Sequence, residues 1–157
     1  MITENHKDFI EKVKAINPKY KLMGLDVGQK KIGVAFVSAD SLVVTPFKTL
    51  LRKNTAFDMQ MLKSVAKDYG VHGVVVGLPL ELTGNEGIAA KKMRHFCEKL
   101  GEALNLPMTM EDERFTTSIA NDMLIETGMN RKTRSRIDDQ VSAQVILESF
   151  MGHISRN

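Results

Sequence analysis

The stretch GLDVGQKKIGVAF, residues 24–36, places a single carboxylate, that of Asp26, at the end of an apolar run and just before a glycine turn. A charged group at the end of a buried strand is costly unless another group compensates for it. Working outward from this stretch, the pattern predicts three consecutive strands, over residues 21–26, 31–38 and 42–47. Tight connections between them indicate an antiparallel meander.

The rest of the chain alternates helical and strand patterns. Helices are predicted around residues 4–15, 57–69, 89–100, 119–128 and 138–154, and strands over residues 71–78 and 107–112. In the second helix Phe57, Met61, Val65 and Tyr69 recur at helical spacing, with Leu62 alongside. A meander followed by such units predicts an α/β fold with a mixed five-stranded sheet, in which an antiparallel three-strand meander joins two parallel strands and helices cover both faces.

Composition excludes several classes of protein. A chain of 157 residues that is 43% hydrophobic is expected to be one globular domain with a substantial core. It has no run of about 18 apolar residues that would predict a membrane span. Its first 20 residues carry acids and lysines where a signal peptide would be apolar. A single Cys97 fits a reducing compartment, so the cytoplasm is expected.

The positive charge is small overall but locally concentrated. The formal net charge is +3, from 22 Lys and Arg against 19 Asp and Glu, which by itself names no partner. The run RKTRSR at 131–136 sets four cations in six residues, directly before Asp138 and Asp139. Two interpretations stay open: a solvated loop, or an edge that contacts nucleic-acid phosphates.

Carboxylates stand where several predicted elements begin or end. Asp26 closes the first strand, Glu113 follows the fifth, and Asp138 and Asp139 open the last helix. If the first and fourth strands are central, these ends converge at the carboxyl edge of the sheet, where open α/β sheets place their ligands. Gathered carboxylates raise one another's pKa, and a hard divalent cation such as Mg²⁺ would relieve that repulsion.

Helical spacing distinguishes the two neighbouring aspartates. Asp139 is in line with Ala143, Ile146 and Phe150, which points it toward the protein body. Asp138 falls on a more polar face, where the role of an N-cap or first-turn acid suits it. Asp139 is therefore the better candidate for a metal ligand.

Other chemical motifs are weaker. The four histidines show no ligand spacing, so surface or core positions are expected for them. The glycine-containing loop GLPLELTGNEG, 77–87, could offer backbone N–H groups to a phosphate at the start of the following helix. Arg114 is a candidate partner for a phosphate or an acid, and Thr116 is a plausible helix cap.

Four blocks of the sequence resemble the YqgF/RuvX family of bacterial proteins, relatives of the RuvC Holliday junction resolvases. The blocks are GLDVGQKKIGVA at 24–35, VVVGLPLELTGNEG at 74–87, DERFTT at 112–117 and DDQVSAQVILESF at 138–150. They occur in the family's order and spacing. The resemblance implies a single RNase H-like domain over residues 20–157, with residues 1–19 as an N-terminal extension.

The same resemblance implies a nuclease that uses divalent metal ions, with Asp26, Glu113 and Asp139 as catalytic acids and metal ligands. Asp112 is the alternative second acid, and Asp138, Arg114 and Thr116 are possible supporting residues. The expected cofactor is Mg²⁺ or Mn²⁺, with two ions. The expected contacts to nucleic acid are Lys30, Lys31, Arg131, Lys132, Arg134 and Arg136.

Three functional hypotheses follow. The leading one is an endonuclease that matures the 5′ end of pre-16S rRNA in the cytoplasm, acting as a monomer or weak homodimer. A Holliday junction resolvase would apply the same chemistry to branched DNA. A non-catalytic nucleic-acid-binding module in transcription or ribosome assembly is the alternative of another class, and it predicts that Asp26 is dispensable.

Overall fold

The computed structural model describes residues 2–41, 43–81, 83–113 and 131–155, with only the backbone described over 131–140. The elements in chain order are α1 His6–Ile16, β1 Lys21–Val27, β2 Lys31–Ser38, β3 Thr45–Leu51, α2 Thr55–Asp68, β4 Gly73–Leu78, α3 Ile88–Leu104, β5 Met108–Asp112 and α5 Arg131–Ser155. The helix predicted around 119–128 lies outside the described residues. None of the described helices has the length and apolar character needed to cross a membrane.

The strands form one mixed sheet in the order β3-β2-β1-β4-β5. β1 pairs antiparallel with β2, and β2 pairs antiparallel with β3. β4 runs parallel to both β1 and β5. The predicted meander, the two parallel strands and the central places of the first and fourth strands are therefore confirmed.

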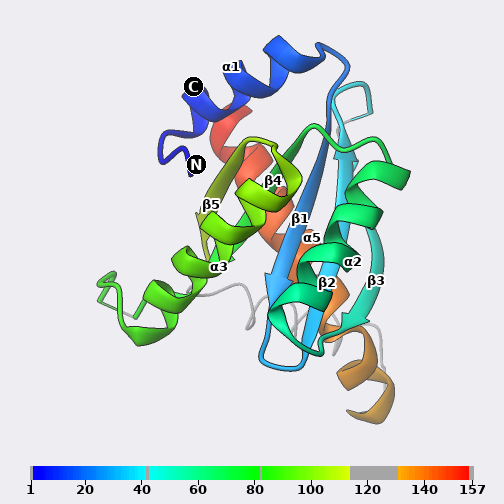
Figure 1. Cartoon of the computed structure of the whole chain (residues 1–157), viewed down its shortest axis with the longest axis vertical. Coiled ribbons are helices and arrows are strands. Elements are labelled where there is room, and N and C mark those ends of the chain that lie inside the picture. The colour runs from blue at the N-terminus through cyan, green and yellow to red at the C-terminus, as the bar shows by residue number, and fades with distance from the viewer. Residues whose placement is uncertain (1, 42, 82, 114–130, 156–157) are drawn as a thin grey trace.

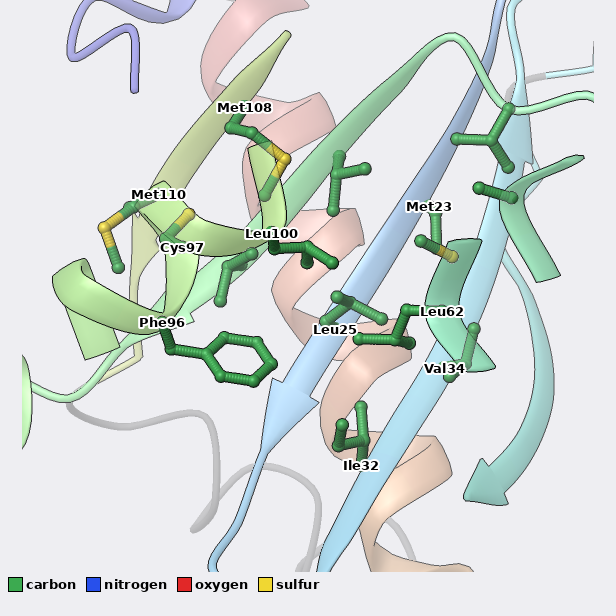
Figure 2. Packing of buried hydrophobic residues seen from close by; sticks show 14 of the residues in the cluster. Met23, Leu25, Ile32, Val34, Leu62, Phe96, Cys97, Leu100, Met108 and Met110 are labelled. Atoms are coloured by element: carbon green, nitrogen blue, oxygen red, sulfur yellow. The ribbon is translucent and has the colours of Figure 1, made fainter. Parts of the chain in front are cut away.

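Helices cover both faces of the sheet, as expected. α2 and α3 lie on the near face in Figure 1, and α5 crosses the far face with α1 beside its C-terminal end. Figure 2 shows the core under α2 and α3, where Met23 and Leu25 of β1 pack near Leu62, Phe96 and Leu100.

A second core lies beneath α1 and α5. Phe9 and Val13 of α1 are fully buried there, and the Phe9 ring meets Phe150 of α5 edge to face. The backbones of β1 and α5 approach closely at Gly24, because a Cβ there would stand 3.0 Å from the Cβ of Leu147 and 3.2 Å from the Ala143 carbonyl oxygen. Gly24 thus sets the contact between the central strand and α5.

Two predicted boundaries are wrong. The third strand runs over Thr45–Leu51 instead of 42–47, because its ladder with β2 starts only at the Phe36–Thr45 pair. Pro46 is tolerated within it because β3 is an edge strand with an irregular register.

α5 begins at Arg131, not at 138, so the RKTRSR run is helical and is not a loop. Asp138 consequently stands two turns inside the helix, which rules out its expected place at the N-cap or in the first turn. Acidic side chains stabilise a helix N-terminus and cations destabilise it, so the charges predict that the helix begins at the aspartate pair. Arg and Lys are nevertheless good helix formers, and here the helix extends through them.

The buried face of α2 also differs from the apolar pattern. It is formed by Asp58, Leu62 and Ala66, whereas Phe57 and Tyr69 are 38% and 41% exposed. The reason is the Asp58 carboxylate, which is almost completely buried and accepts hydrogen bonds from Arg52 Nε at 2.9 Å and from the Lys53 backbone N–H at 3.0 Å. The inner face of α2 therefore includes a paired acid, while Met61 and Val65 of the apolar pattern pack against the core as partly buried residues.

Candidate active site

Asp26 stands at the carboxyl end of the central strand β1 and is half-buried. Side chains alternate along a strand, so Asp26 shares a face with Gly24, the residue that contacts α5. Val27 and the exposed turn at Gly28 follow it directly. The carboxylate therefore projects from the α5 side of the sheet at its carboxyl edge.

Glu113 is the first residue after β5, and its backbone N–H donates to the Leu78 carbonyl at 3.1 Å. Its carboxylate lies over Gly77 of β4. A Cβ on Gly77 would stand 2.6 Å from Ile146 Cδ1 of α5 and would overlap Glu113 Oε2. Because Gly77 has no side chain, the Glu113 carboxylate can lie over β4 and extend toward β1.

The structure brings Asp26 and Glu113 together although β4 separates their strands. The pKa of Glu113 is raised to about 8, first by burial, then by the charge of Asp26 and a hydrogen bond to that carboxylate, and last by the charge of Asp112. In the absence of a cation the protonated Glu113 carboxyl donates to Asp26, so the pair shares one proton.

Asp139 is placed by its backbone alone. It stands one helical turn before Ala143, whose carbonyl oxygen lies beside Gly24 of β1. Nothing is described of the side chains of Asp138 and Asp139. Asp112, the last residue of β5, is half-buried and alternates to the face opposite Glu113.

An arginine that the sequence did not single out holds the turn next to Asp26. Arg52 donates from a guanidinium nitrogen to the Gly28 carbonyl at 2.7 Å, and its backbone N–H donates to the Lys30 carbonyl at 2.8 Å. The same guanidinium pairs with the buried Asp58. Arg52 and Asp58 stand at a strand-to-helix junction with no motif to mark them, so only the three-dimensional structure shows the link.

A hollow of about 650 Å³ opens beside Glu113. Its lining includes the turn after β1, Arg52, Lys92 and the apolar side chains of Ile88, Met93 and Phe96. The Arg52 guanidinium lies 5.2 Å from the centre of the Phe96 ring. The hollow therefore combines an apolar wall with two cations beside Glu113.

The remaining expected contacts are distributed around this edge. Lys30, in the turn after β1, and Lys31, the first residue of β2, are both exposed. Arg131, Lys132, Arg134 and Arg136 belong to the first two turns of α5, where only the backbone is described. Arg114 and Thr116 lie outside the described residues. The loop after β4 leads into α3 at Gly87, which has no side-chain cap.

The sheet order, the helices on both faces and the carboxyl pair at the sheet edge define the class of protein: an RNase H-like fold. T. thermophilus RuvC in complex with a Holliday junction substrate has this fold, with a TM-score of 0.56, 12% identity and coverage of 86% of this chain and 96% of that one. The fowlpox virus Holliday junction resolvase matches with a TM-score of 0.54 at 13% identity, covering 85% of this chain and 99% of that one.

Within this class the chain belongs to the RuvX family, described as Holliday junction resolvase, which matches residues 20–153. A relative from Rickettsia rickettsii (strain Sheila Smith) is 33% identical over 154 residues, which are 98% of each chain. One from Moorella thermoacetica is 37% identical over 137 residues, 87% of this chain and 98% of that protein. Both carry the provisional name pre-16S rRNA nuclease. The resemblance of the four sequence blocks to the YqgF/RuvX family is therefore confirmed.

The raised pKa of Glu113 predicts how stability depends on pH when metal is removed. Its folded pKa of about 8 lies above the ordinary value of 4.5, so between these values the folded state holds a proton that the unfolded chain has lost. The contribution of Glu113 to the free energy of unfolding in EDTA should therefore be greatest below about pH 4.5 and should fall as the pH rises to 8.

Urea unfolding at several pH values between 5 and 8.5, in EDTA, measures this slope. Buried Glu111, with a pKa raised to about 7, contributes in the same direction. Glu113→Gln should flatten the slope and leave only the smaller part due to Glu111. An identical slope in Glu113→Gln and the wild type would contradict the assignment.

Proposed function

We propose that this protein is a divalent-metal-dependent endonuclease that hydrolyses phosphodiester bonds in structured RNA, with the 5′ end of pre-16S rRNA as its substrate. The observation that carries the proposal is the Asp26–Glu113 carboxyl pair at the carboxyl edge of the sheet. A pair held at this edge despite its repulsion is arranged for a cation, because stability alone would favour replacing one acid.

The donor set fits Mg²⁺ or Mn²⁺. Asp26 and Glu113 offer carboxylate oxygens, the ligands that hard divalent ions prefer, and burial together with mutual repulsion favours their neutralisation. Asp139 is proposed as the third ligand, from its place one turn before Ala143. Two divalent ions bound there would supply activation of a water and stabilisation of the leaving oxygen.

The protein's own groups would position the substrate. Arg52 fixes the turn that follows Asp26, and Lys92 lines the same hollow as Arg52. Cations at this edge suit the phosphates on either side of the scissile bond, and the apolar wall suits a base that has left its stack. The exposed Lys30 and Lys31, at the end of the turn and the start of β2, would extend the same phosphate path.

RNA is the preferred substrate because the relatives from Rickettsia and Moorella carry the pre-16S rRNA nuclease name. Branched DNA is the second candidate, because the family is described as Holliday junction resolvase. A resolvase must cut two strands symmetrically and so acts as a dimer, whereas the maturation of an RNA end requires only a monomer or a weak homodimer. Both activities would take place in the cytoplasm.

One experiment tests the proposal and separates its two forms. The protein is incubated with a precursor 16S rRNA containing its 5′ leader and, in parallel, with a four-way DNA junction, each with Mg²⁺ and with Mn²⁺. Metal-dependent cleavage of the RNA supports the leading proposal, and cleavage of the junction alone supports the second. No cleavage of either substrate with either metal would overturn the nuclease assignment and favour a binding module.

The cations at the start of α5 carry a separate prediction about binding. Replacing Arg131, Lys132, Arg134 and Arg136 together by Gln should weaken RNA binding and reduce the slope of log K against log salt concentration. Each cation that contacts a phosphate contributes roughly 0.7–0.9 to the slope. If all four contact phosphates, their replacement should reduce the slope by about three. Binding measured from low to moderate salt on the catalytically impaired Asp26→Asn background gives the slope. An unchanged slope would show that these side chains face solvent only.

A further inference from the structure

A second group of metal-ligating side chains is centred on Glu111, which stands two residues before Glu113 and on the same face of the sheet. Glu111 of β5, whose side chain is 2% exposed, meets His6 of α1 and His153 of α5. One ligand atom from each of the three residues lies within 4.8 Å of those of the other two. His6 lies 105 residues before Glu111, and His153 lies 42 residues after it, so no local spacing marks the three residues in the sequence.

The contacts converge on one carboxylate. His153 Nδ1 lies 2.7 Å from Glu111 Oε1 and 3.2 Å from Oε2, and His6 Nε2 lies 3.9 Å from Oε2. The two imidazole rings are stacked, with centroids 6.1 Å apart and an interplanar angle of 24°. Ser149 donates a long hydrogen bond of 3.4 Å to Oε1. Two ring nitrogens and a carboxylate oxygen thus face one small volume.

We propose that His6, Glu111 and His153 form a binding site for a transition-metal cation of the Zn²⁺ class, distinct from the Asp26–Glu113 pair. Imidazole nitrogens with one carboxylate are ligands that Zn²⁺ takes and Mg²⁺ does not prefer. Tetrahedral zinc with bonds of 2.0–2.2 Å separates its ligand atoms by about 3.4 Å. The observed 2.7 and 3.9 Å separations lie on either side of that value.

The surroundings favour a cation. The ion-pair partners of Glu111 in the described part of the chain are the two histidines, so its buried charge has no permanent counter-charge there. His153 is half exposed, which provides an entry path and leaves a fourth position for water.

Binding would use the histidine nitrogens in defined tautomers. His6 Nε2 lies 3.0 Å from the Met110 carbonyl oxygen, to which the neutral ring can donate. On metal binding Nε2 would give up that proton, and the ring would carry its hydrogen on Nδ1. The site would then join the first helix, the edge strand and the end of the last helix, which lie together at one end of the molecule (Figure 1).

Zinc titration by calorimetry of the full chain, in the absence of nucleic acid and with excess Mg²⁺, tests the proposal. The wild type should bind one equivalent of Zn²⁺ at this site. His6→Gln/His153→Gln should weaken that binding by more than the roughly 10–100-fold that loss of a supporting residue costs. His95→Gln, at an exposed histidine on α3, is the matched control and should bind like the wild type.

Two further measurements keep the outcome decisive. Asp26→Asn/Asp139→Asn should retain the zinc equivalent, which separates this site from the proposed catalytic centre and from the fate of the nuclease proposal. Co²⁺ added to the wild type should give the visible absorption of a four-coordinate ion, and this absorption should be absent from the histidine double variant when circular dichroism shows that variant folded. Equal zinc affinity in the histidine double variant and the wild type, or loss of the equivalent in the aspartate variant, would overturn the proposal.

Discussion

Replacing Asp26 by Asn is expected to reduce cleavage of the precursor rRNA by about 10³-fold or more while binding of the RNA is retained. Loss of a single charge-stabilising donor from an active site already costs roughly 10²–10³ in kcat, and this substitution would remove a charged ligand of the proposed metal site. The carboxamide has the same size as the carboxylate, so the backbone of β1 should not change. Single-turnover cleavage and filter binding on the same RNA measure the two quantities.

The same substitution has a second readout that does not need substrate. The Asp26 charge and hydrogen bond are among the causes that raise the pKa of Glu113, so Asp26→Asn should lower the pKa of Glu113 toward its ordinary value. Titration followed by carboxyl NMR would detect this. Asp40→Asn, at an exposed aspartate in the turn after β2, is the control for loss of one negative charge. Full cleavage by Asp26→Asn would favour the non-catalytic binding module.

Much of this site could be predicted because its acids end strands whose patterns are local. The apolar run before Asp26 and the strand before Glu113 are readable from neighbouring residues, and parallel strands bring their carboxyl ends to one edge. The parallel pairing of β4 with both β1 and β5 brings the two strand ends to the same edge, and Gly77 leaves room for Glu113 to extend across β4. The sequence therefore predicts the edge at which the acids lie, whereas their contact depends on the strand order.

The sequence does not predict compensated charges, one helix boundary or contacts between distant residues. Asp58 is buried in the inner face of α2 because Arg52 neutralises it, and periodicity cannot foresee a compensated acid. Acids suit a helix N-terminus, so the sequence predicts that α5 begins at the aspartate pair, whereas the helix begins at Arg131. The Glu111 cluster is invisible in the sequence for the same reason: its histidines come from the two ends of the chain.

Gly77→Ala is expected to disable catalysis from a position that carries no functional group. The added methyl would overlap Glu113 Oε2 and stand 2.6 Å from Ile146 Cδ1, well inside contact distance. The strand backbone is held on both sides by β1 and β5, so the side chains must give way. A displacement of the carboxylate by about 1 Å should cost roughly 100-fold in kcat, and the overpacking about 1–3 kcal/mol in the free energy of unfolding.

A double variant separates the two effects. Ile146→Val removes the Cδ1 atom that the new methyl would meet, so Gly77→Ala/Ile146→Val should recover part of the lost stability. Catalysis should stay low, because the overlap with Glu113 is unchanged. Gly152→Ala in α5, with nothing within 4 Å of the added Cβ, should keep full activity. If Gly77→Ala cleaves at the wild-type rate, the carboxylate above Gly77 is not part of the catalytic centre, since its position could then change without consequence for the reaction.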